Sequence, residues 1–451
     1  PAGTWNRAGV ILFGGFGKLI ERVSAAGGAP SPVLPKEDND QNPNQLAPQF
    51  LPDGKHFLYG AFGGKTGIFV GSLDGKQSHL LMQQTDSPAF YAPSTSGGPG
   101  FLLFLRQDTL MAQPFDPDKA AFQGDAVPVA SPLANGPTFQ PSANGALLLR
   151  RSQASPPQLI WLDRDGKRLG TVGEPGNLRY PRLSPDQKTV AVARGESGKR
   201  DIWLYDQERG AETRFTFDGD DAYPVWSPDG QRIAYGSFRT SENLVVIRPA
   251  NGMGKETVLF RSQPPVFPVD WSRDGRWLTL LQPFSGPAIS LLPASGDGKP
   301  TPVIPHAFDE RDGCLSPDGR WMLYTSGPSG RREVFVQSLP ESAGGPAGGG
   351  KWQISTAGGQ QPAWRPDGKE IFYLAGDGTM MAVPVESGPA TLKAGAPKAL
   401  FPTHLNSNSI LVRNYDVSID GKRFLLAEPV EGAAPEPLTV ILNWQSLLKS
   451  K

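Results

Sequence analysis

Short β-prone runs alternate with turn sequences along the whole chain, and one arrangement of them recurs. It is clearest in residues 223–235, which read YPVWSPDGQRIAY. Val225 and Trp226 end an apolar run, Pro228 suits the second position of a type I turn, and Gly230 suits the turn's exit. The letters RIAY then begin a second β-prone run. The pattern predicts a strand, a tight turn and a second strand.

The hairpin pattern repeats at a nearly constant spacing. Clear copies lie at 48–59, 180–192, 268–280, 313–324, 362–374 and 415–426, weaker copies at 4–13 and 139–149, and a copy with a longer turn at 90–105. Two further β-prone runs follow most copies. A period of about 40–45 residues with four short strands per unit is typical of propeller blades. We therefore predict an all-β fold, a β-propeller of four-stranded antiparallel blades with about ten repeats.

The repeats tile residues 1–446. We expect blades at approximately 1–40, 46–86, 88–130, 137–175, 178–220, 221–264, 266–308, 311–358, 360–404 and 412–446. Ten blades exceed the usual four to eight. One large ring, two rings with a boundary near residue 176, or part of a larger array all fit. The last repeat shows three strands and no evident closing strand, so we expect further sequence upstream of Pro1.

Composition narrows the classes of partner. Lys plus Arg and Asp plus Glu both number 44, so the formal net charge is zero and a nucleic-acid partner is not expected. Cys314 is the single cysteine, which allows no intrachain disulfide and is expected in the core. No run of about 18 apolar residues occurs, so any membrane attachment would need a segment outside this sequence.

Motifs for catalysis are missing from the sequence. There is no G-x-S-x-G, no H-E-x-x-H, no P-loop and no dinucleotide fingerprint, and the four histidines are scattered singly. We therefore expect no catalytic residues, no metal and no cofactor, and we do not expect an enzyme.

Candidate binding residues lie in the connections that lead from the outer strand of one blade to the inner strand of the next. In a propeller these connections share one face near the axial channel. Carboxylates there could bind a cation, a basic partner or a sugar, and aromatic and Arg residues are typical of binding hot spots. Solvated loop charges and packing at the blade entry are the alternative interpretations. The candidates are Arg179, Tyr180, Asp220, Asp221, Tyr223, Phe267, Asp309, Arg311, Asp312, Gln361, Arg413 and Tyr415.

The repeated W-S-P-D-G pattern resembles the TolB-like, or WD40-like, β-propeller family. More narrowly, GTWNRAGVILF, LIERVSAAGGAPSPV, PQFLPDGKHFLY and LTVILNW look like the C-terminal propeller of bacterial membrane serine/threonine protein kinases. The resemblance implies an extracytoplasmic sensor or protein-interaction region, periplasmic or at the cell surface. The kinase motifs H-R-D-L-x-x-x-N, D-F-G and A-P-E do not occur, so any kinase activity would lie in sequence not present here.

Three functional hypotheses follow. The first is a non-catalytic binding or sensor module for a protein, peptide or envelope ligand, forming the extracytoplasmic part of a receptor-type kinase. The second is a TolB-like envelope scaffold. The third is a propeller glycan hydrolase or lyase that uses the acidic loops. We favour the first because blades tile the chain without a catalytic constellation, although a propeller motif is specific for fold rather than function.

Overall fold

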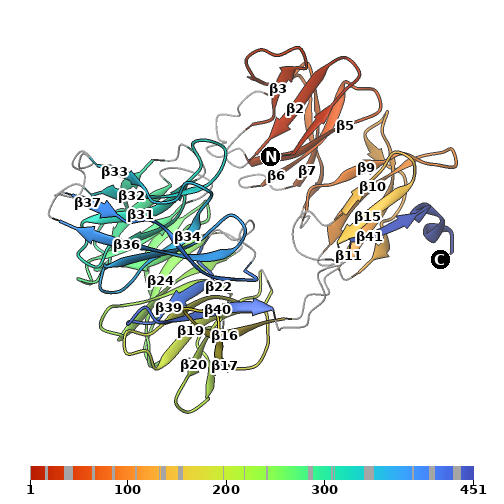
Figure 1. The fold of residues 1–451 in the computed structure, drawn as a ribbon. Helices are drawn as coiled ribbons and strands as arrows, with labels where there is room; N and C mark the ends of the chain where they lie inside the picture. Colours follow the sequence, from red (N-terminus) through yellow and green to blue (C-terminus); the bar gives the residue numbers. More distant parts are fainter. Residues whose placement is uncertain are drawn as a thin grey trace. The chain divides into compact units, whose positions relative to one another are not determined.

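The chain divides into two compact units in the computed structural model (Figure 1). Unit 1 is Pro1–Ala154 with Gly432–Lys451, and unit 2 is Ser155–Glu431. The structure describes residues 2–450 apart from 16–18, 35–43, 63–66, 84–86, 107–108, 132, 134–138, 151–155, 197, 218, 240–241, 283–287, 306–307, 309, 340–349, 389–390, 406–411 and 430–437. The described residues form ten antiparallel sheets, which confirms the all-β propeller prediction.

Unit 2 contains six of these sheets, each running from an inner to an outer strand. The second to fourth sheets are β18 (Leu178–Leu183), β19 (Thr189–Arg194), β20 (Asp201–Asp206), β21 (Glu212–Arg214); β22 (Asp220–Trp226), β23 (Arg232–Phe238), β24 (Asn243–Pro249), β25 (Thr257–Ser262); β26 (Phe267–Trp271), β27 (Trp277–Leu281), β28 (Ile289–Pro293), β29 (Thr301–Ile304). The fifth and sixth are β30 (Arg311–Leu315), β31 (Trp321–Ser326), β32 (Glu333–Ser338), β33 (Lys351–Gln353); β34 (Gln360–Trp364), β35 (Glu370–Leu374), β36 (Thr379–Ser387), β37 (Leu392–Ala394), β38 (Lys398–Pro402).

The first sheet closes the ring of unit 2. Its inner strands β39 (Tyr415–Val417) and β40 (Arg423–Pro429) come from the end of the unit, and its outer strands β16 (Pro157–Asp163) and β17 (Arg168–Val172) come from the beginning. The register pairs Ile160 with Leu426. Apolar clusters join this sheet to the sixth sheet on one side and to the second on the other. Pairing the two ends of the unit in one sheet removes the free edge that an open series would leave.

Unit 1 contains the other four sheets. They are β1 (Ala2–Trp5), β2 (Val10–Gly14), β3 (Glu21–Ser24), β4 (Ser31–Pro32); β5 (Asn44–Phe50), β6 (His56–Phe62), β7 (Gly67–Ser72), β8 (Ser78–Gln83); β9 (Phe90–Ala92), β10 (Gly100–Arg106), β11 (Thr109–Asp116), β12 (Ala121–Phe122), β13 (Val127–Ala130); and β14 (Phe139–Pro141), β15 (Ala146–Arg150), β41 (Leu438–Leu442). The 3-10 helix η1 (Trp444–Ser450) follows β41 and places Trp444 in the core.

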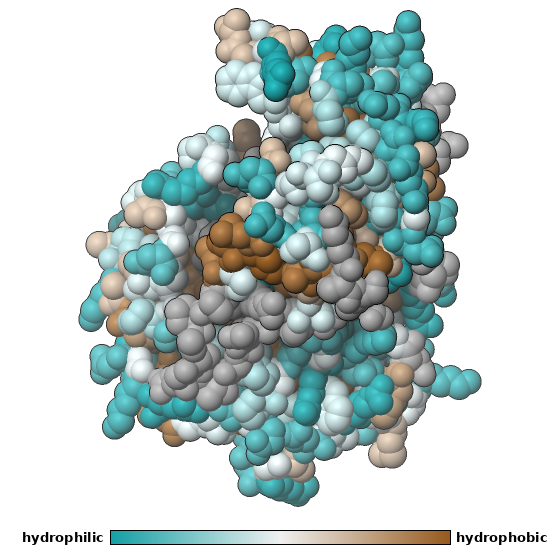
Figure 2. Space-filling model, turned by 90° about the vertical axis from the view of Figure 1, so that its right-hand side faces the viewer, coloured by the Kyte–Doolittle hydropathy of each residue, from teal (hydrophilic) through white to brown (hydrophobic). Residues whose placement is uncertain are grey.

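Unit 1 differs from unit 2 in how its series of sheets ends. Apolar clusters join its first sheet to the second, the second to the third and the third to the fourth. Among the described residues no cluster joins the fourth sheet to the first. Apolar side chains are exposed on these terminal sheets: Trp5 is 65% exposed and Leu442 is 73% exposed. Figure 2 shows hydrophobic residues gathered on one face amid hydrophilic ones.

Two expected blades are divided between the units. Within the expected blade 137–175, β14 and β15 join β41 in unit 1, whereas β16 and β17 join β39 and β40 in unit 2. The expected blade 412–446 is divided in the same way. The division of the chain between the units falls between residues 154 and 155 rather than near residue 176. Local patterns define hairpins but not long-range partners, because a strand of the right pattern can pair with any matching edge.

The repeated hairpin turn has a common hydrogen-bonding pattern. The backbone N–H of Gly230 donates to the carbonyl of Ser227 at 2.9 Å, and the N–H of Arg232 donates to Ser227 Oγ at 2.9 Å. Gly230 has φ +70°, a region that favours glycine. The same turn starts from each of the residues Ser184, Ser272, Ser316 and Ser418. In unit 1, a turn that is one residue shorter starts from Ser142, whose Oγ accepts from the Ala146 N–H at 2.9 Å.

Candidate functional site

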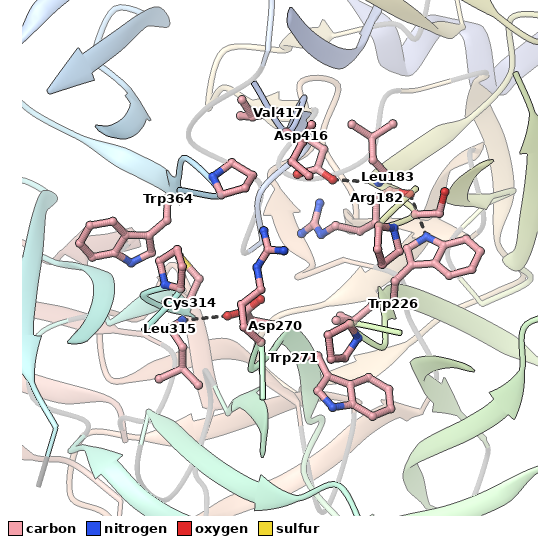
Figure 3. A pocket seen from close by; sticks show the side chains of 18 of the residues that line it. Arg182, Leu183, Trp226, Asp270, Trp271, Cys314, Leu315, Trp364, Asp416 and Val417 are labelled. Atoms are coloured by element: carbon pink, nitrogen blue, oxygen red, sulfur yellow. Dashed lines mark hydrogen bonds between the residues drawn. The ribbon is translucent and has the colours of Figure 1, made fainter. Parts of the chain in front are cut away.

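A cavity of about 180 Å³ lies among the inner strands of unit 2, on the side where these strands end in the repeated turns. Figure 3 shows lining residues from all six sheets, and most of the lining falls into three tiers. Each tier repeats one position of the hairpin motif, because the six sheets are copies of one pattern arranged around a common axis. We call this cavity the axial pocket.

The floor of the axial pocket is formed by the residue two places before the turn's first position. The residues at this position that line the pocket are Arg182, Val225, Asp270, Cys314 and Asp416. Three of the five are charged, although this position lies on an inner strand where a small apolar residue would pack well. The floor is therefore polar, with one guanidinium and two carboxylates among its five residues.

The wall and the rim are mainly apolar. The next residue along each inner strand forms the wall: Leu183, Trp226, Trp271, Leu315, Trp364 and Val417. The second turn residue forms the rim: Pro185, Pro228, Arg273, Pro317, Pro366 and Ile419. Ile419 is 55% exposed, so an apolar side chain is presented to solvent at the entrance. An apolar rim above a charged floor can hold a segment that has apolar flanks and a charged group between them.

Arg182 is the most deeply buried charge of the floor. It is 6% exposed, and its Nη1 donates to the carbonyl oxygens of Pro181 at 2.7 Å, Arg413 at 3.1 Å and Tyr415 at 3.4 Å. Its Nε is buried without a hydrogen-bond partner. Burial and the neighbouring Arg413 guanidinium lower the pKa of Arg182 to about 10. The guanidinium is therefore charged at neutral pH and is solvated only in part by carbonyl groups.

The two floor aspartates connect neighbouring sheets. Asp270 Oδ2 accepts a hydrogen bond from the backbone N–H of Leu315 at 2.8 Å, and Asp416 Oδ2 accepts one from Leu183 at 2.8 Å (Figure 3). Burial raises the pKa of Asp270 to about 6, although the Leu315 N–H and the Arg413 guanidinium act in the opposite direction. Each aspartate thus has a structural partner in the next sheet.

Arg413 is the one sequence-predicted candidate that lines the axial pocket. Its Nε donates to the carbonyl of Tyr415 at 3.1 Å, and its Nη2 donates to Asp416 Oδ1 at 3.1 Å. Burial acts to lower the pKa of Arg413, but the Asp416 carboxylate and other neighbouring groups outweigh it, so the net pKa is raised. Arg413 therefore holds its charge beside Asp416.

Six other predicted residues belong to a buried belt at the opposite end of the inner strands. In this belt Asp312 Oδ2 accepts a hydrogen bond from the Gln361 N–H at 3.1 Å. Gln361 Oε1 accepts one from Asn414 at 2.8 Å, and Asn414 Oδ1 accepts one from Tyr180 at 2.7 Å. Tyr415 adds a hydrogen bond from its hydroxyl to the Gln361 carbonyl at 2.8 Å. The belt joins the fifth, sixth, first and second sheets of the ring.

Aromatic rings continue this belt through the second, third and fourth sheets. The ring centroids of Tyr180 and Tyr223 are 4.3 Å apart, and those of Tyr223 and Phe267 are 4.5 Å apart. Tyr180, Tyr223, Asp312 and Gln361 all have φ between +52° and +60°, at the bulge of their inner strands. A bulge turns the side chain toward the next sheet, which is how the repeat builds the belt. These contacts support the alternative interpretation that the residues pack at the blade entry. A role of these residues in ligand binding stays a prediction.

The remaining predicted candidates lie in several settings. Asp220 forms a bidentate ion pair with Arg200, at 2.6 and 2.7 Å. Asp221 is 4% exposed, and its burial raises its pKa. Arg179 and Arg311 are half-buried, and Asp309 lies outside the described residues. A ligand role for these residues stays a prediction.

None of the five floor residues was predicted from the sequence as a binding residue. The available signal was variation at one fixed position of the repeat. Val225 and Ala363 occupy that position in two copies, whereas Arg182, Asp270 and Asp416 occupy it in three others. A charge at a position that packing would leave apolar indicates a functional or structural requirement.

The described part of the chain contains one cysteine thiol as a potentially reactive group. Cys314 is buried, as predicted, and burial raises the pKa of its thiol to about 12, so the thiol stays protonated. No group of three or more His, Cys, Asp or Glu that could hold a metal ion occurs among the described residues. No helix among them is long and apolar enough to cross a membrane.

Comparison with known proteins agrees with this architecture. Residues 164–343, all within unit 2, match the TolB beta propeller domain family (PD40). The chain contains a TolB-like β-propeller. The matched residues extend from the end of β16 beyond the end of β32, so they include the turns that carry four of the six rim residues.

Individual relatives match smaller parts of the chain. The Tol-Pal system protein TolB of Alcanivorax borkumensis is 31% identical over 148 residues, which cover 30% of this chain and 33% of that protein. The uncharacterized peptidase YuxL of Bacillus subtilis is 27% identical over 156 residues, or 32% of this chain and 21% of that protein. The chain thus spans a third or less of these relatives. The solved structure of a putative TolB from Agrobacterium tumefaciens has a TM-score of 0.45 at 17% identity, covering 60% of this chain and 98% of that one.

Proposed function

We propose that unit 2 is a non-catalytic binding module that holds a segment of another protein in the axial pocket. The observation that carries this proposal is the pocket's construction, an apolar rim and aromatic wall above a charged floor, at the axis of a closed ring. Concave sites with apolar walls and a few fixed polar groups are typical of ligand binding. Aromatic and Arg side chains are the usual energetic anchors of protein interfaces.

The family comparison supports a location and a class of partner. One relative is named as a Tol-Pal system protein, and the sequence resembles the propellers of membrane kinases. We propose that the module works outside the cytoplasm and serves as a sensor for a protein, peptide or envelope ligand. Fusing a reporter enzyme that folds only in the periplasm to the protein as its own gene encodes it tests the location. Activity is expected, and an inactive but full-length fusion argues against the location.

Binding by the axial pocket can be tested with a random peptide library displayed on phage and selected against the full chain. The expected result is enrichment of peptides whose binding is lost in Ile419→Ser, which replaces an exposed apolar rim residue. Leu169→Ser is the matched control, because Leu169 is 48% exposed on β17 of the same sheet but does not line the pocket. If the enriched peptides bind the Ile419→Ser variant as tightly as they bind the parent protein, their binding site lies outside the axial pocket.

A further inference from the structure

We infer that the axial pocket selects a carboxylate, from an acidic side chain or a chain terminus, and that Arg182 is its receptor. This inference rests on the proposed function, since it specifies the chemistry of the segment that the pocket takes. The carboxylate would approach along the axis, pass the apolar rim and meet the guanidinium on the floor.

The first support is the incomplete solvation of Arg182. A guanidinium has five N–H donors, and burial without an ionised partner is costly. Here a single nitrogen, Nη1, donates to all three carbonyl oxygens. The Nε atom is buried and has no hydrogen-bond partner. The side chain points into the pocket in Figure 3. A carboxylate accepts two parallel N–H groups from a guanidinium, which no carbonyl can do.

The second support is that the pocket's own carboxylates are already used. Asp416 accepts hydrogen bonds from the Leu183 backbone and from Arg413. Asp270 accepts one from the Leu315 backbone, in the next sheet. Moving either carboxylate to Arg182 would break a contact between sheets. The floor therefore has a guanidinium available to a ligand, whereas its two carboxylates already accept hydrogen bonds from neighbouring sheets.

The third support is the size and shape of the space. A cavity of about 180 Å³ is far larger than the ~10–15 Å³ that one water molecule needs, and it suits one short side chain or a chain terminus. Four prolines and Ile419 form most of the rim, so the residues flanking the carboxylate should be apolar. The preferred ligand is thus an acidic group within an apolar segment.

Small probes test this chemistry on the full chain without knowledge of the natural partner. N-acetyl-glutamate amide is titrated by calorimetry against N-acetyl-glutamine amide and N-acetyl-lysine amide. N-acetyl-leucine and its C-terminal amide form a second arm, which tests a terminal carboxylate. The acidic member of one or both arms should bind at least 10-fold more tightly than its neutral partner. Equal binding of neutral and acidic probes, or preference for the lysine derivative, would overturn the inference.

Variants locate the receptor. Arg182→Gln should weaken the acidic probe at least 10-fold, and Arg182→Lys should weaken it less, because charge is kept and the two-pronged geometry is lost. Arg209→Gln, which removes the same charge from an exposed position of unit 2 that does not line the pocket, should change binding less than 3-fold. If Arg182→Gln does not fold, Arg182→Lys together with the probe series still decides the question. Unchanged binding in a folded Arg182→Gln would remove Arg182 from the site.

The outcomes separate this inference from the proposed function. Library peptides that bind through Ile419 but carry no required carboxylate would leave the binding module standing and would refute the carboxylate preference. Probe binding through Arg182 with no peptide enrichment would leave the carboxylate site standing and would refute a protein segment as the partner.

Discussion

The two units use one repeat to build two different assemblies. In unit 2, strands from the beginning and the end of the unit share a sheet, and the six sheets close around the axial pocket. In unit 1, β41 from the C-terminal segment pairs with β15, but among the described residues no apolar cluster joins the fourth sheet to the first. The repeat thus supplies the sheets, and long-range pairing decides whether they form a ring.

Closure also changes what the inner strands can do. In unit 2 they carry the belt that runs from Asp312 through Gln361 and Asn414 to Tyr180, and their other ends surround a pocket. In unit 1 the terminal sheets expose apolar residues such as Trp5 and Leu442. In a closed ring each sheet packs against two neighbouring sheets. Every inner strand therefore lies between the inner strands of those two sheets. The following predictions test this contrast.

The largest effect is expected for Trp444→Ala. Trp444 is fully buried and packs in the cluster that joins the third and fourth sheets of unit 1. Its truncation should lower the stability of unit 1 by about 3–5 kcal/mol. Calorimetric unfolding should show one transition moving to lower temperature while that of unit 2 stays in place. A parallel shift of both transitions would mean that the units unfold together.

Leu426→Ala tests the closing sheet of unit 2. Leu426 is fully buried on β40 opposite Ile160 of β16, where the two ends of the unit meet. We expect a loss of about 2–5 kcal/mol that is confined to the unit 2 transition. Leu169→Ala, at an exposed position on β17, serves as the control and should change stability little. A small effect of Leu426→Ala would show that the ring does not depend on this pairing.

Asp270→Asn should reduce the change with pH in the free energy of unfolding of unit 2. The pKa of Asp270 is raised from the ordinary 3.8 to about 6, so the folded state binds the proton more tightly than the unfolded state. Stability should therefore fall as pH rises from about 4 to 6, by at most about 3 kcal/mol. The asparagine keeps an acceptor for the Leu315 N–H.

Chemical denaturation at pH 4 and pH 7 measures this effect. The parent and Asp270→Asn should be nearly equal in stability at pH 4, whereas the variant should be more stable at pH 7. Asp312, whose pKa burial also raises to about 6, is present in both proteins and so cancels from the difference. A variant that is less stable than the parent at pH 7 would contradict the sign of the prediction.

The smallest effect is expected in the repeated turn, where the two units should behave alike. Ser227 in unit 2 and Ser142 in unit 1 each accept a hydrogen bond at Oγ from the second strand of their hairpin, at 2.9 Å in both cases. Ser227→Ala and Ser142→Ala should each cost about 1 kcal/mol in their own unit. Denaturant midpoints measure both, and effects differing several-fold would show that the turns depend on their tertiary setting.

Much of the fold could be predicted because the repeat is local. The Ser-Pro-Asp-Gly turn sets its own geometry through side-chain and backbone hydrogen bonds, and alternation marks the flanking strands. The partners of β15 and β16 could not be predicted in this way. These strands are neighbours in the chain but pair with β41 and β40, whose sequences lie hundreds of residues away.

The candidate site shows the same limit. Sequence reasoning placed binding residues before each inner strand, and the structure brings Tyr180, Tyr223 and Gln361 together there as a buried belt. The axial pocket lies at the opposite end of these strands. Arg182 and Asp270 look unremarkable in sequence because each stands alone in its own repeat. Their convergence depends on the ring.

The order of residues is enough to establish the all-β class, the period of about 45 residues, the turn geometry and the number of sheets. These properties follow from interactions within a few residues, which the order of side chains specifies directly. The two units, the closing sheet of unit 2 and the charged floor of the axial pocket become visible only in the folded chain. Those features depend on which edges and which equivalent positions meet in space, and similar repeats leave that choice open until the whole chain packs.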